Sequence, residues 1–363
     1  MQKRTLTILC VAVAILIGSC ARPKPEIRPY SDFLVQSDCD FGDMPSQMLE
    51  YLLMTHKPFG TSDHKMAFHY KYKFYFYDFA TKSYQYLAKQ EMGDQPFCCP
   101  DTSTLWYTYQ RKELINALGD KRLPFKAQMP YYDTSFAAVS YAELPIVNNR
   151  LYTTVFNTNP DVSPDAYKHF PRAAIWQIQD DTLLFERLFA TLPDNFPHDN
   201  YGANQPARFI FNPDDSVLVF YNGALDDVQI YDLDGNHIAD HYLGSQYFTT
   251  PPDLSLNDFY DLSKFIEYGE THTLYKSLYY DPYRKVYLRT MLLPADNDTN
   301  SMEKASYSTI IIVADRDFNI LYEVLFDNSD YHVFLRLMPR PEGVYVMRKV
   351  SEYETRADLF VFD

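Results

Sequence analysis

The sequence predicts an all-β fold, a six-bladed β-propeller. Short apolar runs rich in β-branched and aromatic residues recur along the chain in six units, spaced by roughly 55 residues. Aromatic residues make up 17% of the 363 residues, with 32 Tyr and 26 Phe, whereas glycine occurs only 11 times. Such runs favour strands, and six units of about four strands are typical of a propeller. A pair of β-sandwiches and an irregular all-β fold are the alternatives.

Each predicted unit is marked by a strand of four to six residues. These strands are 67–70, 105–109, 151–156, 217–221, 286–289 and 344–347. Most are followed by a second strand that ends in an acidic residue, as at Asp78, Asp232 and Asp315. The Asp-Gly pair at 234–235 predicts a hairpin turn before a third run. The second unit is the least regular, because the residues after Tyr109 suit a helix as well as a strand.

The N-terminal segment is predicted to close the ring. The last unit ends at Asp363 and leaves no room for an outer strand. We therefore expect the segment near residues 30–35 to join the last blade as its missing strand. Residues 31–363 then form a single propeller domain.

The first nineteen residues predict a lipoprotein signal peptide. Lys3 and Arg4 form a basic start, and residues 6–17 are largely apolar. This run has the length of a signal sequence and is too short to span a membrane. It ends in Ile-Gly-Ser-Cys at 17–20, which resembles the lipobox of bacterial lipoproteins, and the resemblance implies that Cys20 is lipidated. An ordinary signal peptide with an incidental cysteine is the alternative.

Residues 20–30 are predicted to form a tether between the lipid and the domain. Prolines at 23, 25 and 29 make this segment stiff. Surface-exported lipoproteins of the Bacteroidetes resemble one another in an acidic stretch after the lipidated cysteine, whereas residues 21–26 here are basic before they are acidic. We therefore expect an outer-membrane lipoprotein that faces the periplasm rather than the cell surface.

The net charge of the chain argues against nucleic acid as a partner. The formal charge is −15 at pH 7, and the acidic residues are spread along the sequence. An acidic chain is repelled by the phosphate backbone, whereas a dispersed negative charge keeps a protein soluble. We therefore expect contact with the membrane through the lipid anchor alone.

Three cysteines remain once the signal peptide is removed and Cys20 is lipidated. A disulfide from Cys39 to either Cys98 or Cys99 is compatible with an oxidising compartment and would tie the N-terminal segment to the domain. A metal or redox site at Cys98 and Cys99 is the alternative, although adjacent cysteines lack the usual spacing of zinc ligands. We predict no metal and no cofactor.

The lipobox, the six Tyr- and Phe-rich units and the scarcity of glycine together resemble the uncharacterised six-bladed β-propeller lipoproteins of the Bacteroidetes. Among these the chain looks most like a domain-of-unknown-function family with a TolB-like propeller, over residues 31–363. The resemblance implies a fold. It implies no activity, because the family has no settled function from which a catalytic residue is carried over.

A ligand site is predicted in the loop from Pro193 to Arg208. This loop precedes the inner strand of the fourth unit, and loops that enter inner strands approach the central channel of a propeller. His198, Asn200, Tyr201 and Arg208 offer a ring for stacking, an amide and a cation, a set that suits a sugar or a carboxylated peptide. The alternative is a loop held by its own Asn and Asp side chains.

No sequence motif predicts catalysis. The G-x-S-x-G motif of serine hydrolases is absent. We therefore expect a non-catalytic binding or scaffold protein that recognises a glycan, a peptide or a partner protein of the envelope. The enzymatic alternative is a periplasmic carbohydrate-active hydrolase with a pair of carboxylates in the central channel, since glycoside hydrolysis needs only two well-placed acids. A structural subunit of an envelope complex is a third hypothesis.

Overall fold

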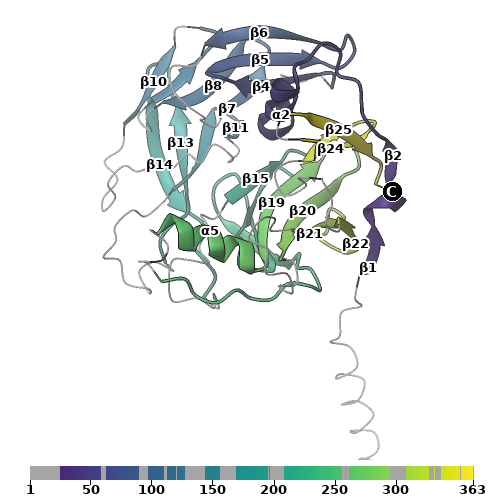
Figure 1. Cartoon of the computed structure of the whole chain (residues 1–363). Coiled ribbons are helices and arrows are strands. Elements are labelled where there is room, and N and C mark those ends of the chain that lie inside the picture. The colour runs from purple at the N-terminus through teal and green to yellow at the C-terminus, as the bar shows by residue number, and fades with distance from the viewer. Residues whose placement is uncertain are drawn as a thin grey trace, which may run out of the picture.

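The chain folds into β-sheets arranged around a common centre (Figure 1). This computed structural model describes residues 25–58, 63–89, 97–109, 113–119, 121–126, 144–155, 169–194, 196, 208–255, 258, 261–294, 308–326, 331, 337–351 and 353–362. The predicted signal peptide and Cys20 lie outside these residues.

Two of the sheets are four-stranded antiparallel meanders of consecutive strands. The first joins β3 (Lys57–Pro58), β4 (Lys65–Tyr70), β5 (Lys73–Asp78) and β6 (Ser83–Lys89). The other joins β15 (Arg208–Asn212), β16 (Val217–Tyr221), β17 (Asp227–Tyr231) and β18 (His237–Tyr242). Both meanders carry the alternating apolar and aromatic residues that favour strands.

An eight-stranded sheet contains two further meanders. One comprises β7 (Phe97–Asp101), β8 (Thr104–Tyr109), β9 (Glu113–Asn116) and β10 (Arg122–Lys126). The other comprises β11 (Ile146–Val147), β12 (Arg150–Thr154), β13 (Ala173–Ile178) and β14 (Leu183–Phe189). The outer strands β10 and β14 pair in parallel, with Phe125 opposite Leu183. This short pairing merges two four-stranded groups into one sheet.

The last two sheets each include a strand from the N-terminal segment. One consists of β19 (Leu274–Asp281), β20 (Val286–Leu293), β21 (Ser308–Ala314) and β22 (Ile320–Phe326), with β1 (Glu26–Pro29) parallel to β22. The other consists of β23 (Leu337–Arg340), β24 (Gly343–Lys349) and β25 (Thr355–Phe360), with β2 (Leu34–Gln36) antiparallel to β25.

Strand β2 confirms the prediction that the N-terminal segment joins the last unit. Leu34 lies opposite Phe360, and the backbone N–H of Cys39 donates to the carbonyl of Ala357 at 2.8 Å. The predicted tether of residues 20–30 needs a correction, however, because Glu26–Pro29 within it form β1 and Tyr30 begins η1. The outer edge of β22 offers free backbone groups that the residues of β1 pair with.

Three helical segments accompany the strands, and the strand pattern did not predict them. They are η1 (Tyr30–Asp32), α2 (Ser46–Thr55) and α5 (Leu262–Thr271). Helix α2 buries Leu49, Leu52 and Leu53, which follow helical spacing. Helix α5 begins after Asp261, whose carboxylate accepts from the first free backbone N–H groups. Among the described residues, neither α-helix is long and apolar enough to cross a membrane.

The hydrophobic core is distributed between neighbouring groups of strands. Six clusters of buried side chains each join two consecutive groups, and one of these clusters joins the last group to the first. The middle strands can consequently be buried on both faces, and every residue of β21 is buried, whereas the outer strands β6 and β18 are largely exposed. Helix α2 packs into the cluster between the first and the last group.

Short polar turns join the outer strands. The Asp232 carboxylate accepts hydrogen bonds from the backbone N–H of Asp234 and Asn236, and Asp315 bonds in the same way to the turn that ends at Asn319. At such hairpins an Asp side chain commonly accepts hydrogen bonds from the backbone N–H groups of the turn residues that follow it. These carboxylates are therefore committed to the fold.

The prediction of an all-β propeller is confirmed, whereas the number of sheets differs from expectation. The described strands form five hydrogen-bonded sheets rather than six. The difference arises because pairing of β10 with β14 fuses two groups that the sequence pattern counts separately.

We predict that Phe33→Ala destabilises the whole domain. Phe33 is 3% exposed, and its ring stacks on Tyr322 at 5.5 Å and contacts Phe362 at 5.6 Å between centroids. The free energy of unfolding, from urea titration, should fall by about 3–5 kcal/mol. The matched control is Tyr353→Ala, at a ring that is 74% exposed, with an expected change within about 0.5 kcal/mol. Equal effects would show that the N-terminal segment is not part of the core.

Candidate functional site

A cavity of about 520 Å³ lies where the inner strands of the groups come together. Each inner strand, β3, β7, β11, β15, β19 and β23, supplies residues to its wall. The wall residues are His56, Lys57, Pro58, Met66, Phe97, Cys98, Cys99, Pro100, Leu144, Pro145, Ile146, Val147, Phe211, Pro213, Tyr279, Tyr280, Pro282, Tyr283 and Pro339. The volume is that of a small-molecule site, and its place is the central channel.

Proline characterises this wall, because each inner strand contains a proline or is adjacent to one. The six prolines are Pro58, Pro100, Pro145, Pro213, Pro282 and Pro339. An inner strand is an edge strand whose free backbone groups face the channel, and proline has no N–H to present there. The wall is therefore largely apolar, and it resists pairing with an added strand.

Tyr279 provides a hydrogen-bonding group that the fold does not use. Its side chain lines the cavity, and its hydroxyl is buried without a hydrogen-bonding partner among the described residues. The adjacent Tyr280 differs, since its hydroxyl donates to the Asp214 carboxylate at 2.6 Å. A buried hydroxyl without a partner is unfavourable.

The described wall contains no Asp or Glu. Asp281 follows the wall residue Tyr280, but it is fully buried and accepts from the Arg284 guanidinium at 2.6 Å and from two backbone N–H groups. Burial raises the pKa of Asp281, and the neighbouring Arg284 opposes this effect. The described wall thus lacks the carboxylate pair that the hydrolase alternative requires.

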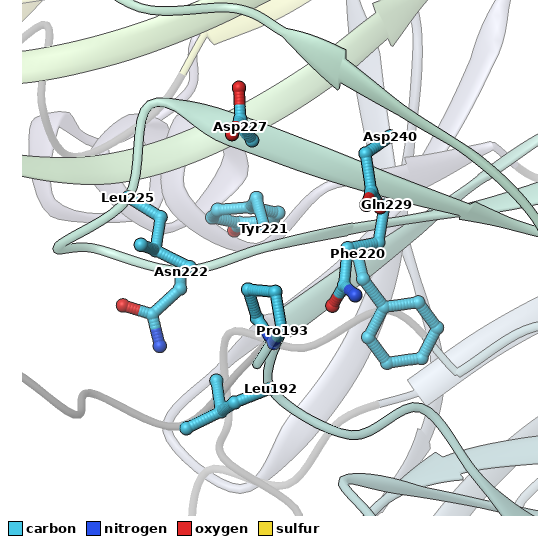
Figure 2. Close-up of a pocket in the computed structure, with 9 residues that line it drawn as sticks. All are labelled: Leu192, Pro193, Phe220, Tyr221, Asn222, Leu225, Asp227, Gln229 and Asp240. Carbon is cyan, nitrogen blue, oxygen red and sulfur yellow. The ribbon is translucent and has the colours of Figure 1, made fainter. Parts of the chain in front are cut away.

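A second pocket, of about 50 Å³, lies at the start of the predicted ligand loop. Figure 2 shows Leu192 and Pro193 below the strands that carry Asp227 and Asp240. Both carboxylates are exposed, and Asp240 pairs with the His237 ring at 2.7 Å. This pocket has room for a few water molecules rather than for a sugar ring.

Only one of the predicted ligand residues falls within the described part of the chain. His198, Asn200 and Tyr201 lie outside it. Arg208 is the first residue of β15 and does not line the large cavity, which lies at the opposite end of that strand. Its Nη1 donates to the backbone carbonyl of Lys276 at 2.9 Å.

The three described cysteines carry free thiols, so the predicted disulfide from Cys39 is wrong. Cys39 packs beside α2, in the cluster between the first and last groups. Cys98 and Cys99 are consecutive in β7 and point into two different clusters, because side chains alternate along a strand.

The alternation of Cys98 and Cys99 along β7 also argues against a metal ion bound by both thiols. The described residues contain no group of three or more His, Cys, Asp or Glu placed to hold a metal ion.

The sequence contains a signal for this wall that the strand pattern did not reveal. Proline stands beside Asn or Asp at three of the inner hairpins, at 100–101, 212–213 and 281–282. The Asn212 side chain accepts from the backbone N–H of residues 214 and 215, and Asp281 makes the equivalent bonds. The repeated Pro and Asx pair therefore marks the channel end of the inner strands.

These features define an all-β propeller with an apolar cavity in its channel. No protein-family model and no curated protein matches the chain. A member of the DUF4221 family from Bacteroides vulgatus is similar in structure, with a TM-score of 0.63 and 18% identity over 85% of this chain and 92% of that chain. The β-propeller domain of Cps50 (Swd1) from Myceliophteria thermophila gives a TM-score of 0.43 and 9% identity, over 85% of this chain and 96% of that chain.

The similarity to the Bacteroides protein confirms, at the level of the fold, the resemblance to an uncharacterised Bacteroidetes propeller family. At 18% identity it carries no information about activity. The function therefore has to be argued from the site.

We predict that the thiols of a chain starting at residue 21 react only after unfolding. Burial raises the pKa of Cys39 to about 11 and that of Cys98 to about 12, so neither is a thiolate at neutral pH. Iodoacetamide labelling followed by mass spectrometry should find the three thiols unmodified in the native protein and modified in denaturant without reductant. A disulfide-linked peptide containing Cys39 would contradict the structure.

We predict that Tyr279→Phe leaves stability unchanged or raises it by up to about 1 kcal/mol, because it removes a buried hydroxyl that has no partner. The matched control is Tyr280→Phe, which loses the bond to Asp214 and should cost about 1 kcal/mol. Both values come from urea unfolding. An equal loss in the two variants would mean that the Tyr279 hydroxyl has a partner in the protein.

Proposed function

We propose that the protein is a non-catalytic binding propeller of the cell envelope, whose central cavity receives an apolar or aromatic group of a peptide or partner protein. The observation that carries this proposal is the cavity of about 520 Å³ with wall residues from every inner strand. A site built at the meeting point of all the groups is rigid, since each strand is fixed by two packed neighbours.

The ring is proposed to have six blades. The support is the division of the strands into six groups: five are four-stranded meanders of consecutive strands, and the sixth, β23–β25, is completed by β2. The six interface clusters follow the same order around the ring.

The chemistry of the wall favours a peptide or protein group over a glycan. A sugar needs several hydrogen bonds, whereas the wall offers mainly proline, aliphatic and aromatic surface. The prolines also disfavour addition of a peptide as an extra strand, so the ligand would enter with a side chain or a chain end.

We still propose that the protein is located at the periplasmic face of the outer membrane, with a lipid on Cys20. Strand β1 begins at Glu26, so the tether would comprise residues 20–25. Six residues of a proline-rich segment extend about 20 Å. The anchor would hold the domain close to the membrane, with the β22 edge nearest to the lipid.

The test is binding of N-phenyl-1-naphthylamine, a neutral fluorophore, to residues 21–363. We expect a saturable rise in fluorescence and competition by short peptides with aromatic side chains, but not by disaccharides. Val147→Trp places a large ring in the wall and should weaken binding at least tenfold. The matched control is Ile238→Trp, at an exposed position on β18, with unchanged affinity.

Equal affinities in the two Trp variants would contradict binding in the cavity. Competition by disaccharides alone would contradict a peptide or protein ligand and would favour the glycan hypothesis. Thermal unfolding of each variant checks that the Val147 change leaves the fold intact.

A further inference from the structure

Two cations lie together towards the other end of the inner strands. Arg208 begins β15 and Lys276 is near the start of β19, and the Arg208 guanidinium donates to the Lys276 carbonyl at 2.9 Å. The cavity residues Phe211 and Tyr279 come three positions later on the same two strands. Three residues of strand span about 10 Å, so the cations are separate from the apolar wall.

No acidic side chain among the described residues pairs with these two cations. The Arg208 Nε is buried and has no hydrogen-bonding partner in the described part of the chain. Burial, and next the positive charge of Arg208, lower the pKa of Lys276 to about 8. Neighbouring like charges that are withdrawn from water repel each other, and such a pair is stabilised when an anion joins it.

Helix α5 leaves space beside the lysine. The Lys276 Nζ lies 3.9 Å from the position that a Cβ would take at Gly269, in the last turn of the helix. Tyr268 of α5 shares a small buried cluster with Leu274, the first residue of β19. Glycine within a helix costs about 1 kcal/mol relative to alanine. The free carbonyl groups of the last turn supply only a partial negative charge, which is less than two cations require.

We propose that Arg208 and Lys276 form an anion-binding site beneath α5, which takes the carboxylate or phosphate group of a ligand. The guanidinium would contact two oxygens of the anion, and the ammonium would contact the third or a shared oxygen. This site does not depend on the occupant of the apolar cavity. A ligand with an anionic end and an apolar end about 10 Å apart would reach both.

The first experiment is calorimetric titration of residues 21–363 with sodium sulfate at constant ionic strength and pH 7. We expect saturable binding that Lys276→Met and Arg208→Met each weaken at least tenfold. Lys276→Arg should keep binding within threefold, because it retains the charge. The matched control is Lys285→Met, which removes one exposed positive charge at the far end of β19 and should leave affinity unchanged.

Separate titrations with acetate and inorganic phosphate distinguish the two anion classes. Equal affinity in wild type, Lys276→Met and Lys285→Met would overturn the proposal, as would the absence of binding by all three anions. Gly269→Leu fills the space without changing charge, and it should weaken sulfate binding while N-phenyl-1-naphthylamine binding stays unchanged. Loss of the fluorophore signal alone would refute the cavity proposal and leave the anion site standing.

A pH series provides a second readout. A lysine with a lowered pKa releases its proton in the folded protein before it does so in the unfolded chain. The free energy of unfolding should therefore rise as pH increases from about 8 towards the ordinary lysine pKa of 10.5. Lys276→Met should abolish this rise and Lys285→Met should keep it. Sulfate should shift the rise to higher pH, because a bound anion favours the protonated amine.

Discussion

The structure depends on closure of the ring of strands. Each group of strands packs against two neighbours, so the first and last groups are shielded from water on both faces only when they meet. The N-terminal segment makes that closure: β2 pairs with β25, and the backbone N–H of Asp38 donates to the buried carboxylate of Asp358 at 2.7 Å. Phe33 and α2 then fill the space around this seam. The stability of the distant cavity thus depends on a segment close to the predicted membrane anchor.

Buried charges in this protein mainly connect neighbouring groups of strands. Arg289 of β20 is wholly buried and donates to the carbonyl oxygens of Asn222, Leu225, Asp226 and Leu243, in the preceding group. Its guanidinium also lies 3.5 Å from the centre of the Tyr275 ring. Backbone carbonyls that would otherwise be unpaired are satisfied in this way. The four carbonyl contacts mark Arg289 as a structural residue, and its Nε is buried without a partner among the described residues.

Closure of the ring also determines which residues line the channel. The inner strands keep one unpaired edge each, and all of these edges face the same narrow space. Proline makes that space apolar at one end. The proposed anion site at Arg208 and Lys276 lies towards the other end of β15 and β19. The two chemistries follow from the positions of a few residues along β15 and β19. The two proposed sites would therefore differ in the ligands they prefer.

The sequence by itself determined the strands, their grouping and the N-terminal strand that closes the ring, because apolar alternation and turn residues are local signals. It also contained the Pro and Asx pairs of the inner hairpins, although their meaning needs the channel to be seen. Only the tertiary structure decided which side chains share a site. Tyr279 and Pro100 line one cavity, and Cys39 stays apart from Cys98, because of contacts between residues far apart in the chain. Fusion of two groups through β10 and β14 is decided in the same way, since pairing of outer strands depends on how neighbouring groups are placed around the ring.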